Sequence, residues 1–484
     1  MSIVRIKNLY LKYKSMNIAV KASLWFALCS ILQKGISVIT LPIFTRLMPT
    51  NQFGQYSIFQ TWYNILILIV TLNIQSEIFN KGLITNSEDK DKYTANQVGL
   101  LLTLSGIFVG VYFIFKEKVN QFMGLTTFLM LVMLIEILAN AIIALWFARK
   151  RFDYEYLKII TVTMISSILN PVVGVIAVVY SSDKAQARIV SNAIIPLMIS
   201  VVILFSVVKK GKLFSNYSWW KTAVMGSLPL IPHYLSLILL NQSDKLMINH
   251  FCGPEDAAIY SVAHSAGLLM TIVNTSINGS FVPWVYTKLK VNDTENIHNV
   301  TFSLSAIVLF CNVILVWFAP EAIRILAAPQ YSMATYCLVP IATSVFFFFV
   351  YTVIVDIEIY YGKNYYVAIA SVIAAILNLV LNYIFIPKYG FLAAGYTTLV
   401  SYCFTMIIHC VFLKKIQKSV KSSVKIIDYK NIVLLAIALI ILVGIAVALY
   451  SNFAVRLIIV LFVAVIAVIH RDKILSTVRM LKKK

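Results

Sequence analysis

Long apolar runs alternate with short polar segments along almost the whole chain. The first series lies at approximately 19–45, 56–80, 95–115, 121–148, 157–181 and 186–208, and the second at approximately 222–249, 256–284, 300–325, 333–360, 364–386, 391–413, 430–450 and 453–470. A helix needs about 20 apolar residues to cross the hydrocarbon core of a bilayer, and each run is near or above that length. The pattern therefore predicts an all-α integral membrane protein with about 14 transmembrane helices.

The composition agrees with this pattern. Of the 484 residues, 60% are apolar and 12% are charged, and the mean hydropathy is +0.86. Soluble domains carry about 25% charged residues, so a water-soluble core cannot accommodate this much apolar surface. A transmembrane β-barrel is excluded as well, because runs such as 432–449 show no alternation of apolar and polar positions.

The formal net charge of +22 comes from lysines and arginines that cluster between the apolar runs, most densely at 149–151, 209–212, 414–430 and 482–484. Such clusters mark the cytoplasmic side of a membrane protein, so we expect both termini in the cytoplasm and no nucleic-acid partner. The basic break after the sixth run divides the chain into an N-terminal lobe (1–210), a C-terminal lobe (211–425) and a segment with two further helices and a basic cytoplasmic tail (426–484).

Two short echoes indicate an internal repeat. Tyr56 follows a polar turn after the first run, and Tyr260 follows a similar turn after the seventh, 204 positions later. The segment from Ile168 to Val172 resembles the segment from Ile376 to Val380, 208 positions later. Two echoes at nearly one offset predict two parallel six-helix lobes, with the last two helices appended.

These features resemble the polysaccharide flippases of the multidrug/oligosaccharidyl-lipid/polysaccharide exporter superfamily, the O-antigen and capsule translocases known as Wzx. The resemblance covers nearly the whole chain. Short sequence motifs typical of the family lie at residues 45–47 and 53–56, at Asp244, Gly253 and Tyr260, and at residues 386–390 and 393–395. Where the family usually has Gly-Ala, this chain has Ala394-Gly395.

The resemblance implies a V-shaped, two-lobed bundle with a central cavity. The cavity would accept an undecaprenyl-diphosphate-linked oligosaccharide from the cytoplasmic leaflet and release it at the external leaflet. Such a protein is a transporter rather than an enzyme, it lies in the bacterial cytoplasmic (inner) membrane, and it serves O-antigen, lipopolysaccharide, capsule or exopolysaccharide biosynthesis. Its expected partners are the lipid-linked glycan, membrane lipids, and the polysaccharide polymerase with its chain-length machinery. No cofactor is expected beyond coupling to protons or sodium ions.

Two alternatives stay open at this stage. A cation-coupled multidrug exporter of the same superfamily would have a mostly acidic cavity, whereas the first run offers Lys34. A membrane-embedded glycan polymerase or ligase typically needs a large external loop, and every predicted loop is short. No P-loop motif is present in the sequence, which argues against ATP hydrolysis by this chain.

Ionisable side chains deep in a bilayer are costly unless they are paired or hydrated, so each is a candidate for function. Lys34 shares a helical face with Ser30 and Ser37 in the first run. We expect this stripe to line the substrate cavity, where Lys34 would contact the diphosphate or an acidic sugar. Alternatively, Lys34 pairs with a neighbouring carboxylate or extends to the membrane interface.

Two further polar stripes are candidates for the substrate cavity. Asn241, Asp244 and Lys245 share a face of the seventh predicted helix, where they would bind sugar or form a gate, and the last two would neutralise each other. His264, Asn274 and Asn278 follow one face of the next helix. Such side chains bind sugar hydroxyls, and they also hold helices together.

The remaining candidates are single charged residues. A desolvated carboxylate can exchange a proton or cation, which makes Glu77, Glu136, Asp356 and Glu358 coupling candidates. Arg46 and Arg324 lie at predicted external helix ends and are candidates for a gate or an exit contact. The cysteines and histidines are dispersed, so neither a metal site nor a catalytic residue is predicted.

Overall fold

The computed structural model of the protein describes residues 15–291, 297–419 and 427–469. Within these residues the regular structure is helical and contains no strand, which confirms the predicted all-α class. The helices form two compact units, one that extends to Leu235 and one that begins at Ser236. The boundary therefore falls within the helix α11 (Ile231–Cys252).

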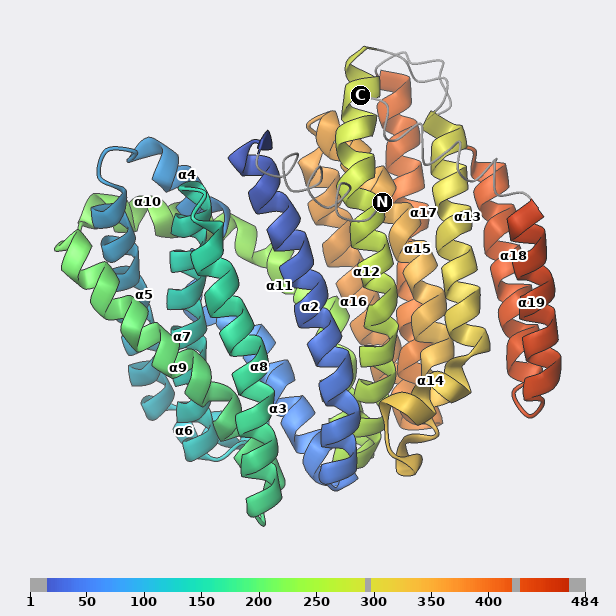
Figure 1. The fold of residues 1–484 in the computed structure, drawn as a ribbon, viewed down its shortest axis with the longest axis horizontal. Coiled ribbons are helices and arrows are strands. Elements are labelled where there is room, and N and C mark those ends of the chain that lie inside the picture. Colours follow the sequence, from blue (N-terminus) through green and yellow to red (C-terminus); the bar gives the residue numbers. More distant parts are fainter. Residues whose placement is uncertain (1–14, 292–296, 420–426, 470–484) are drawn as a thin grey trace, which may run out of the picture. The chain divides into compact units, whose positions relative to one another are not determined.

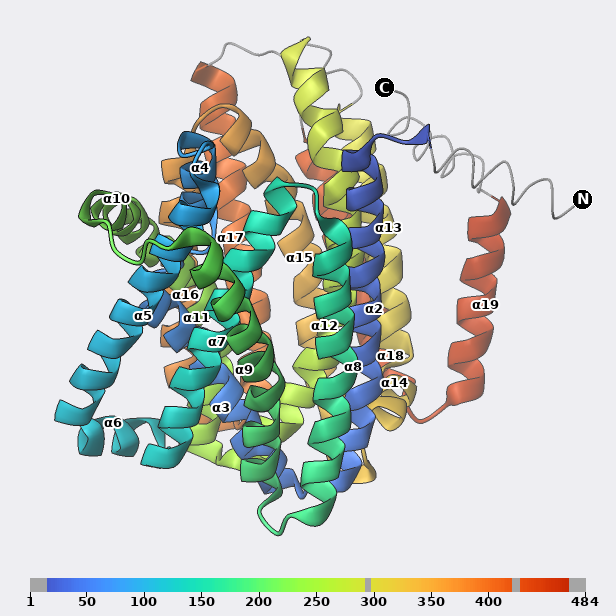
Figure 2. The same ribbon diagram turned by 60° about the vertical axis from the view of Figure 1, so that its left-hand side comes forward.

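Unit 1 contains most of the helices that Figure 1 draws in blue and green. Their bounds are α2 (Ile18–Leu47), α3 (Thr50–Thr71), α4 (Glu77–Thr85), α5 (Lys90–Ile114), α6 (Lys116–Met123), α7 (Thr127–Phe152), α8 (Tyr156–Tyr180), α9 (Lys184–Gly211) and α10 (Tyr217–Ser227). Figure 2 shows the short α6 between the ends of α5 and α7. A 3₁₀ turn, η1 (Leu228–Leu230), links α10 to α11.

Unit 2 continues from α11 to the end of the described chain. Its helices are α12 (Pro254–Lys290), α13 (Ile297–Trp317), α14 (Ala319–Leu326), α15 (Ala334–Tyr360), α16 (Asn364–Tyr389), α17 (Leu392–Ser419), α18 (Tyr429–Ala448) and α19 (Phe453–Ile469), with a 3₁₀ turn, η2 (Pro329–Tyr331), before α15. The first turn of α18 is capped, because the Asp428 side chain accepts a hydrogen bond from the backbone amide of Asn431.

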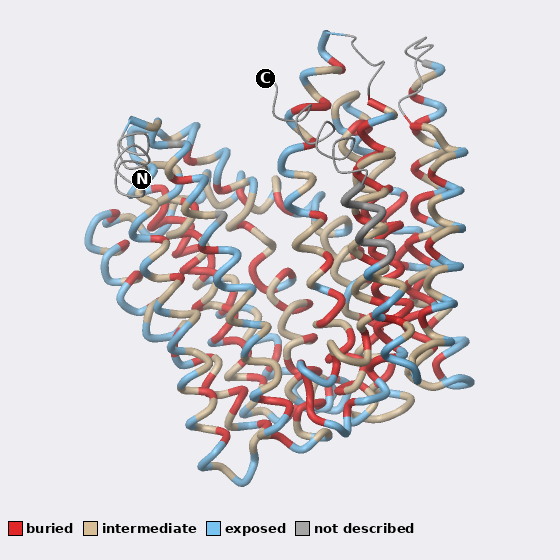
Figure 3. Tube along the Cα trace, turned by 45° about the vertical axis from the view of Figure 1, so that its right-hand side comes forward, coloured by how far each residue is buried: buried red, intermediate tan, exposed pale blue. Residues whose placement is uncertain are grey.

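Helix α15 forms the core of unit 2. It is apolar on all sides, which is typical of a helix surrounded by others, and it packs against α12, α13, α16 and α17. Phe346, Phe349 and Val350 are completely buried in a cluster that extends to Leu439 of α18. Figure 3 shows such buried positions in the interior of each unit. Helix α18 therefore contributes to the same apolar core as α15.

Twelve helical segments among the described residues are long and apolar enough to cross a membrane. Every predicted apolar run coincides with a helix, and the multi-pass membrane class is confirmed. Helices α3 and α19 match predicted runs but are outside these twelve: α3 carries the polar residues Gln55, Gln60 and Asn64 along its length, and α19 has 17 residues.

The structure interrupts the second predicted helix. Helix α3 ends at Thr71, and Leu72 and Asn73 adopt positive φ angles of 48° and 52° before α4 begins at Glu77. Residues other than glycine rarely adopt such angles. The Asn73 side chain stabilises the break, because its Oδ1 accepts a hydrogen bond from Ser76 Oγ at 2.9 Å.

Candidate functional site

A buried carboxylate is the centre of a polar cluster in unit 2. Asp244 of α11 is only 2% exposed. Its Oδ2 accepts hydrogen bonds from the Tyr260 hydroxyl of α12 at 2.5 Å and the Thr398 hydroxyl of α17 at 2.7 Å. Its Oδ1 accepts a hydrogen bond from Asn382 Nδ2 of α16 at 2.6 Å. Four helices therefore meet at one carboxylate, and we call these four residues with Asn378 the Asp244 cluster.

Asn378 connects the members of the Asp244 cluster. Its Oδ1 accepts hydrogen bonds from Asn382 Nδ2 at 3.1 Å and from Ser243 Oγ at 3.3 Å, and its Nδ2 donates to Thr398 Oγ1 at 3.3 Å. All of these partners are neutral. A buried charge is costly unless it is compensated. The donors stabilise the Asp244 carboxylate, but because they are neutral they do not cancel its negative charge.

Lys245 makes a different contact from the one that its spacing predicts. Its Nζ donates to Gln242 Oε1 at 3.4 Å, and no ion pair with Asp244 is found in the part of the chain that the structure describes. Consecutive side chains on an α-helix point about 100° apart, which explains the separation. Lys245 and Asp244 attract each other electrostatically, and their mutual neutralisation stays a prediction.

A cavity of about 160 Å³ opens beside the Asp244 cluster. Its polar and aromatic lining comprises Asn241, Asp244, Tyr260, His264, Thr271, Ser344, Phe348, Thr398 and Tyr402. The Tyr402 hydroxyl donates to Asn241 Oδ1 at 3.0 Å across this wall. At about 30 Å³ per water molecule, the cavity has room for several waters beside Asp244.

Unit 1 contains a second buried polar cluster. Glu136 of α7 is 2% exposed, and its Oε1 accepts a hydrogen bond from Asn192 Nδ2 of α9 at 2.6 Å. Arg188, also on α9, donates to Asn170 Oδ1 of α8 at 3.2 Å and lies 5.3 Å from the centre of the Tyr56 ring. Arg188 also attracts Glu136 electrostatically. We call these five residues the Arg188 cluster, and its two charges have opposite sign.

The positions of the predicted repeat lie in these two clusters. Tyr56 and Asn170 contact Arg188 in unit 1, and Tyr260 and Asn378 belong to the Asp244 cluster in unit 2. The echoed positions therefore lie in a polar cluster of their own unit, and the charged groups beside them differ. An arginine occupies the cluster in unit 1, whereas the cluster in unit 2 surrounds a carboxylate.

The polar stripe predicted in the first helix is found on the surface of α2. Lys34 and Ser37 are both exposed, and Ser37 Oγ donates to the Gln33 carbonyl at 3.0 Å. Lys34 is therefore exposed on unit 1 and not buried in a pair.

The stripe predicted in the eighth helix separates into two parts. Asn274 Nδ2 donates to the Val345 carbonyl at 3.3 Å, and Asn278 Nδ2 donates to Thr352 Oγ1 at 3.3 Å. Both acceptors are on α15, so these asparagines hold α12 against α15. His264, in contrast, lines the cavity beside the Asp244 cluster.

The four predicted coupling carboxylates lie in different surroundings. One, Glu136, belongs to the Arg188 cluster. Glu77 accepts a hydrogen bond from the Tyr234 hydroxyl at 2.6 Å, and the fully buried Glu358 contacts His409 Nδ1 at 2.9 Å. Asp356 is half-buried on α15. The structure does not assemble them into one site.

The two arginines predicted at external helix ends lie on separate units. Arg46 Nη1 donates to the Pro42 carbonyl at 3.1 Å, one turn earlier in α2. Arg324 is exposed on α14. Their role at a gate or exit stays a prediction.

Sequence reasoning missed several members of the clusters. Arg188 lies inside an apolar run, which is the signal that selected Lys34, and it could have been found in the same way. Asn378 and Asn382 are one turn apart on α16 and form a polar stripe. Thr398 gives no such signal, because its neighbours on α17 are also small or polar.

No group of three histidine, cysteine, aspartate or glutamate side chains that could hold a metal ion is found in the described residues. The Asp244 cluster offers a different donor set, which consists of carboxylate, amide and hydroxyl oxygens. Oxygen donors suit hard cations, and hydroxyls can both donate and accept hydrogen bonds. Carboxylate, amide and hydroxyl oxygens are the donor types that hard cations prefer.

Comparison with known proteins gives matches along most of the chain. The sequence model of a family described as polysaccharide biosynthesis protein matches residues 19–288, more than half of the chain. A protein of Haemophilus influenzae named for the Lsg locus is 20% identical over 371 residues, which cover 74% of this chain and 88% of that protein.

Solved structures show the same fold. The lipid II flippase MurJ in an inward closed conformation aligns with a TM-score of 0.64 at 16% identity and covers 93% of this chain and 100% of that chain. An inward-facing multidrug resistance transporter of the MATE family aligns with a TM-score of 0.60 at 12% identity and covers 81% and 96%. The matches confirm the resemblance to this exporter superfamily that the sequence motifs indicated.

Proposed function

Because this chain belongs to the polysaccharide biosynthesis protein family, we propose that it flips undecaprenyl-diphosphate-linked oligosaccharide repeat units across the bacterial cytoplasmic membrane. The flipping serves O-antigen, capsule or exopolysaccharide biosynthesis and works by alternating access. The family match, together with the twelve apolar helical segments found in the described residues, carries this proposal. The fold shared with a lipid II flippase supports it.

The Asp244 cluster is the coupling centre in this proposal. Its carboxylate is buried among neutral donors, so a proton or sodium ion that arrives through the adjoining cavity would neutralise the charge. The three groups that donate hydrogen bonds to Asp244 point hydrogen atoms at its carboxylate, whereas a bound cation must be contacted by oxygen lone pairs. These groups must therefore reorient when the cation binds. The cluster joins α11, α12, α16 and α17, so cation binding favours one arrangement of these helices over another.

Deletion of the gene in the producing bacterium tests the proposed substrate. We expect undecaprenyl-diphosphate-linked glycan to accumulate in lipid extracts and surface polysaccharide to fall, and a plasmid copy of the gene to reverse both changes. A Lys34→Ala copy, expressed at the wild-type level, should restore less surface polysaccharide, because the exposed ammonium no longer attracts the diphosphate.

The same strains separate the flippase from a multidrug exporter, which the fold shared with MATE transporters leaves as the second candidate. Unchanged lipid-linked glycan together with increased sensitivity to cationic drugs would support the exporter and rule out the flippase.

A further inference from the structure

The interrupted helix in unit 1 borders a cleft. The chain leaves the helical path between Thr71 and Glu77, with Leu72 and Asn73 in the left-handed region. Strained backbone of this kind persists where the surrounding structure enforces it, and it is common at ligand sites. Interrupted membrane helices in transporters line binding cavities, because their polar backbone must avoid lipid.

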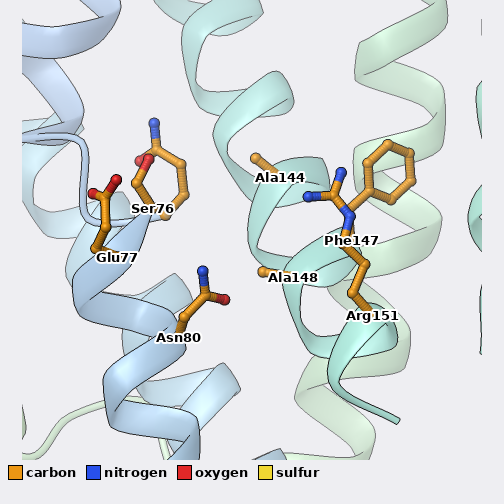
Figure 4. A pocket seen from close by; sticks show the side chains of 8 residues that line it. Ser76, Glu77, Asn80, Ala144, Phe147, Ala148 and Arg151 are labelled. Atoms are coloured by element: carbon orange, nitrogen blue, oxygen red, sulfur yellow. The ribbon is translucent and has the colours of Figure 1, made fainter. Parts of the chain in front are cut away.

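The cleft has a volume of about 390 Å³, within the range of about 300–1,000 Å³ that is usual for small-molecule sites. Gln75 and Ser76 of the break and Glu77 and Asn80 of α4 form one wall, and α7 forms the other. Figure 4 shows Glu77 and Asn80 facing Ala144 and Ala148 across the gap, with Phe147 and Arg151 at the side of α7.

The lining carries hydrogen-bonding capacity that the described residues do not use. Gln75 Oε1 is buried and has no hydrogen-bond partner among them, and an unsatisfied buried acceptor costs about 1–3 kcal/mol unless a ligand or water meets it. The Glu77 carboxylate is held in place by the Tyr234 hydroxyl at 2.6 Å and retains a second oxygen. Two hydroxyl groups supplied by a ligand would satisfy both acceptors, because each hydroxyl donates one hydrogen bond.

The chemistry of the lining fits a saccharide better than a phosphate. It offers amide donors and acceptors, a carboxylate and a guanidinium, which together match hydroxyls that both donate and accept. The Phe147 ring gives an apolar surface for a sugar face. One carboxylate balances one guanidinium, so a diphosphate would meet a single cation and a repelling anion.

We infer that this cleft is a saccharide-binding subsite, in which Gln75, Asn80 and Arg151 hold a sugar ring of the transported lipid. The inference rests on the proposed function and adds to it a place of glycan contact. Basic clusters at 149–151 and 209–212 mark this end of unit 1 as cytoplasmic in the sequence-based topology, so the subsite lies on the side of uptake.

A binding comparison tests the subsite. The full chain in nanodiscs is offered two probes: the undecaprenyl-diphosphate-linked glycans extracted from the producing bacterium, and undecaprenyl diphosphate without sugar. Native mass spectrometry then gives the ratio of the two affinities. We expect wild type to prefer the glycan-bearing lipid, and Asn80→Ala to lower that preference by about fivefold, the effect of one lost neutral hydrogen bond. Affinity for undecaprenyl diphosphate should stay unchanged.

Two further variants complete the test. Ala144→Leu narrows the cleft without removing a polar group and should also lower the preference, whereas Lys81→Ala, on the exposed side of α4, should not. The subsite would be overturned if wild type bound both probes equally. It would also be overturned if Asn80→Ala and Ala144→Leu both kept the wild-type preference for the glycan-bearing lipid. If wild type binds neither probe, the proposed function fails, and the subsite fails with it. Thermal unfolding of each variant verifies its fold.

Discussion

At the scale of single residues, the Tyr260 hydroxyl has the shortest hydrogen bond to Asp244, at 2.5 Å. Tyr260→Phe removes this donor and leaves the ring in its buried position. Because the acceptor is a buried carboxylate, we expect unit 2 to lose about 1.5–3 kcal/mol of stability. Thermal unfolding in detergent, followed by tryptophan fluorescence, measures the change.

Tyr56→Phe is the matched control for this change. Tyr56 occupies the equivalent position of the repeat, but its ring, rather than its hydroxyl, contacts Arg188 at 5.3 Å. Phenylalanine retains a cation–π contact. We therefore expect a change within about 0.5 kcal/mol, the usual range for substitutions that remove no specific contact. Equal destabilisation by both substitutions would contradict the role assigned to the Tyr260 hydroxyl.

Glu155, which lies outside the membrane-spanning segments, makes the stability of unit 1 depend on pH. Hydrogen bonds from Lys150, at 2.8 Å, and from Lys158 lower the pKa of Glu155 to about 2. A pKa that is lower in the folded state contributes stability above the ordinary glutamate value of about 4.3. This contribution should be constant from pH 7 to about 5 and decline as the pH falls through about 2.

The difference between wild type and Glu155→Gln isolates this contribution from those of other carboxylates. The Glu155 side chain is 30% exposed, so solvent weakens its ion pairs and the difference in stability should stay below about 1 kcal/mol at pH 7. Thermal unfolding at several pH values should show the two curves converging below about pH 3. Curves that stay parallel down to pH 2 would contradict the assignment.

Sequence reasoning selected Asp244 and Glu136, which the structure shows to be buried, but it did not predict what they contact. Asp244 was identified because a carboxylate in an apolar run must be compensated. Its partners Asn382 and Thr398 follow it by 138 and 154 positions, so only tertiary structure identifies them. Periodicity also places Lys34 on a polar face, but it cannot distinguish a buried polar face from the exposed one that α2 presents.

At the scale of elements, hydropathy predicted where helices occur because each span needs a long apolar run. It did not predict the break after Thr71, because Leu72, Ile74 and Ile78 continue the apolar run on both sides of the polar residues. The break depends on local side-chain to backbone hydrogen bonds: Thr71 Oγ1 accepts from the Asn73 amide at 3.2 Å. Such bonds compete with the helix without changing the hydrophobic pattern.

The last described helix is anchored by one ion pair. Arg456 of α19 donates to both carboxylate oxygens of Glu321 in α14, at 2.9 and 2.7 Å, and to the Trp317 carbonyl at 2.5 Å. These hydrogen bonds lower the pKa of Glu321. The Arg456 side chain is 2% exposed and that of Glu321 is 32% exposed. Loss of Glu321 therefore leaves a buried charge, whereas loss of Arg456 leaves a charge that water can reach.

Removing Glu321 should therefore cost more than removing Arg456. Glu321→Gln leaves a buried guanidinium without a counter-ion, which costs about 3–5 kcal/mol. Arg456→Met leaves a carboxylate that water can reach and should cost less than about 2 kcal/mol. Hydrogen exchange of α19 amides in each variant compares the two losses. The opposite order would contradict the difference in burial.

At the scale of the whole molecule, the repeat predicted from the sequence pairs positions whose charged neighbours differ between the two units. The sequence predicted the equivalence from Tyr56, Tyr260, Asn170 and Asn378. It did not predict that Arg188 provides a built-in positive charge in unit 1, because Arg188 has no counterpart of its kind in unit 2. In unit 2 the hydrogen-bond partners of Asp244 are neutral, so compensation must come from an exchangeable cation or from the less direct field of Lys245.

This difference predicts that only one unit couples transport to cations. Asp244→Asn keeps the size of the side chain and removes the charge, and we expect it to abolish the dependence of flipping on a sodium or proton gradient. Glu136→Gln should leave that dependence intact, because we assign to the permanent charge of Arg188, which attracts Glu136, the place that the exchangeable cation takes at Asp244. Flipping is measured in proteoliposomes that contain lipid-linked glycan from the producing bacterium. A sodium ion at ten times its dissociation constant should also stabilise wild type by about 1.4 kcal/mol, and the Asp244 variant not at all. If wild type instead responds to pH and not to sodium, the exchanged cation is a proton. Loss of the gradient response in Glu136→Gln with its retention in Asp244→Asn would place the coupling centre in unit 1.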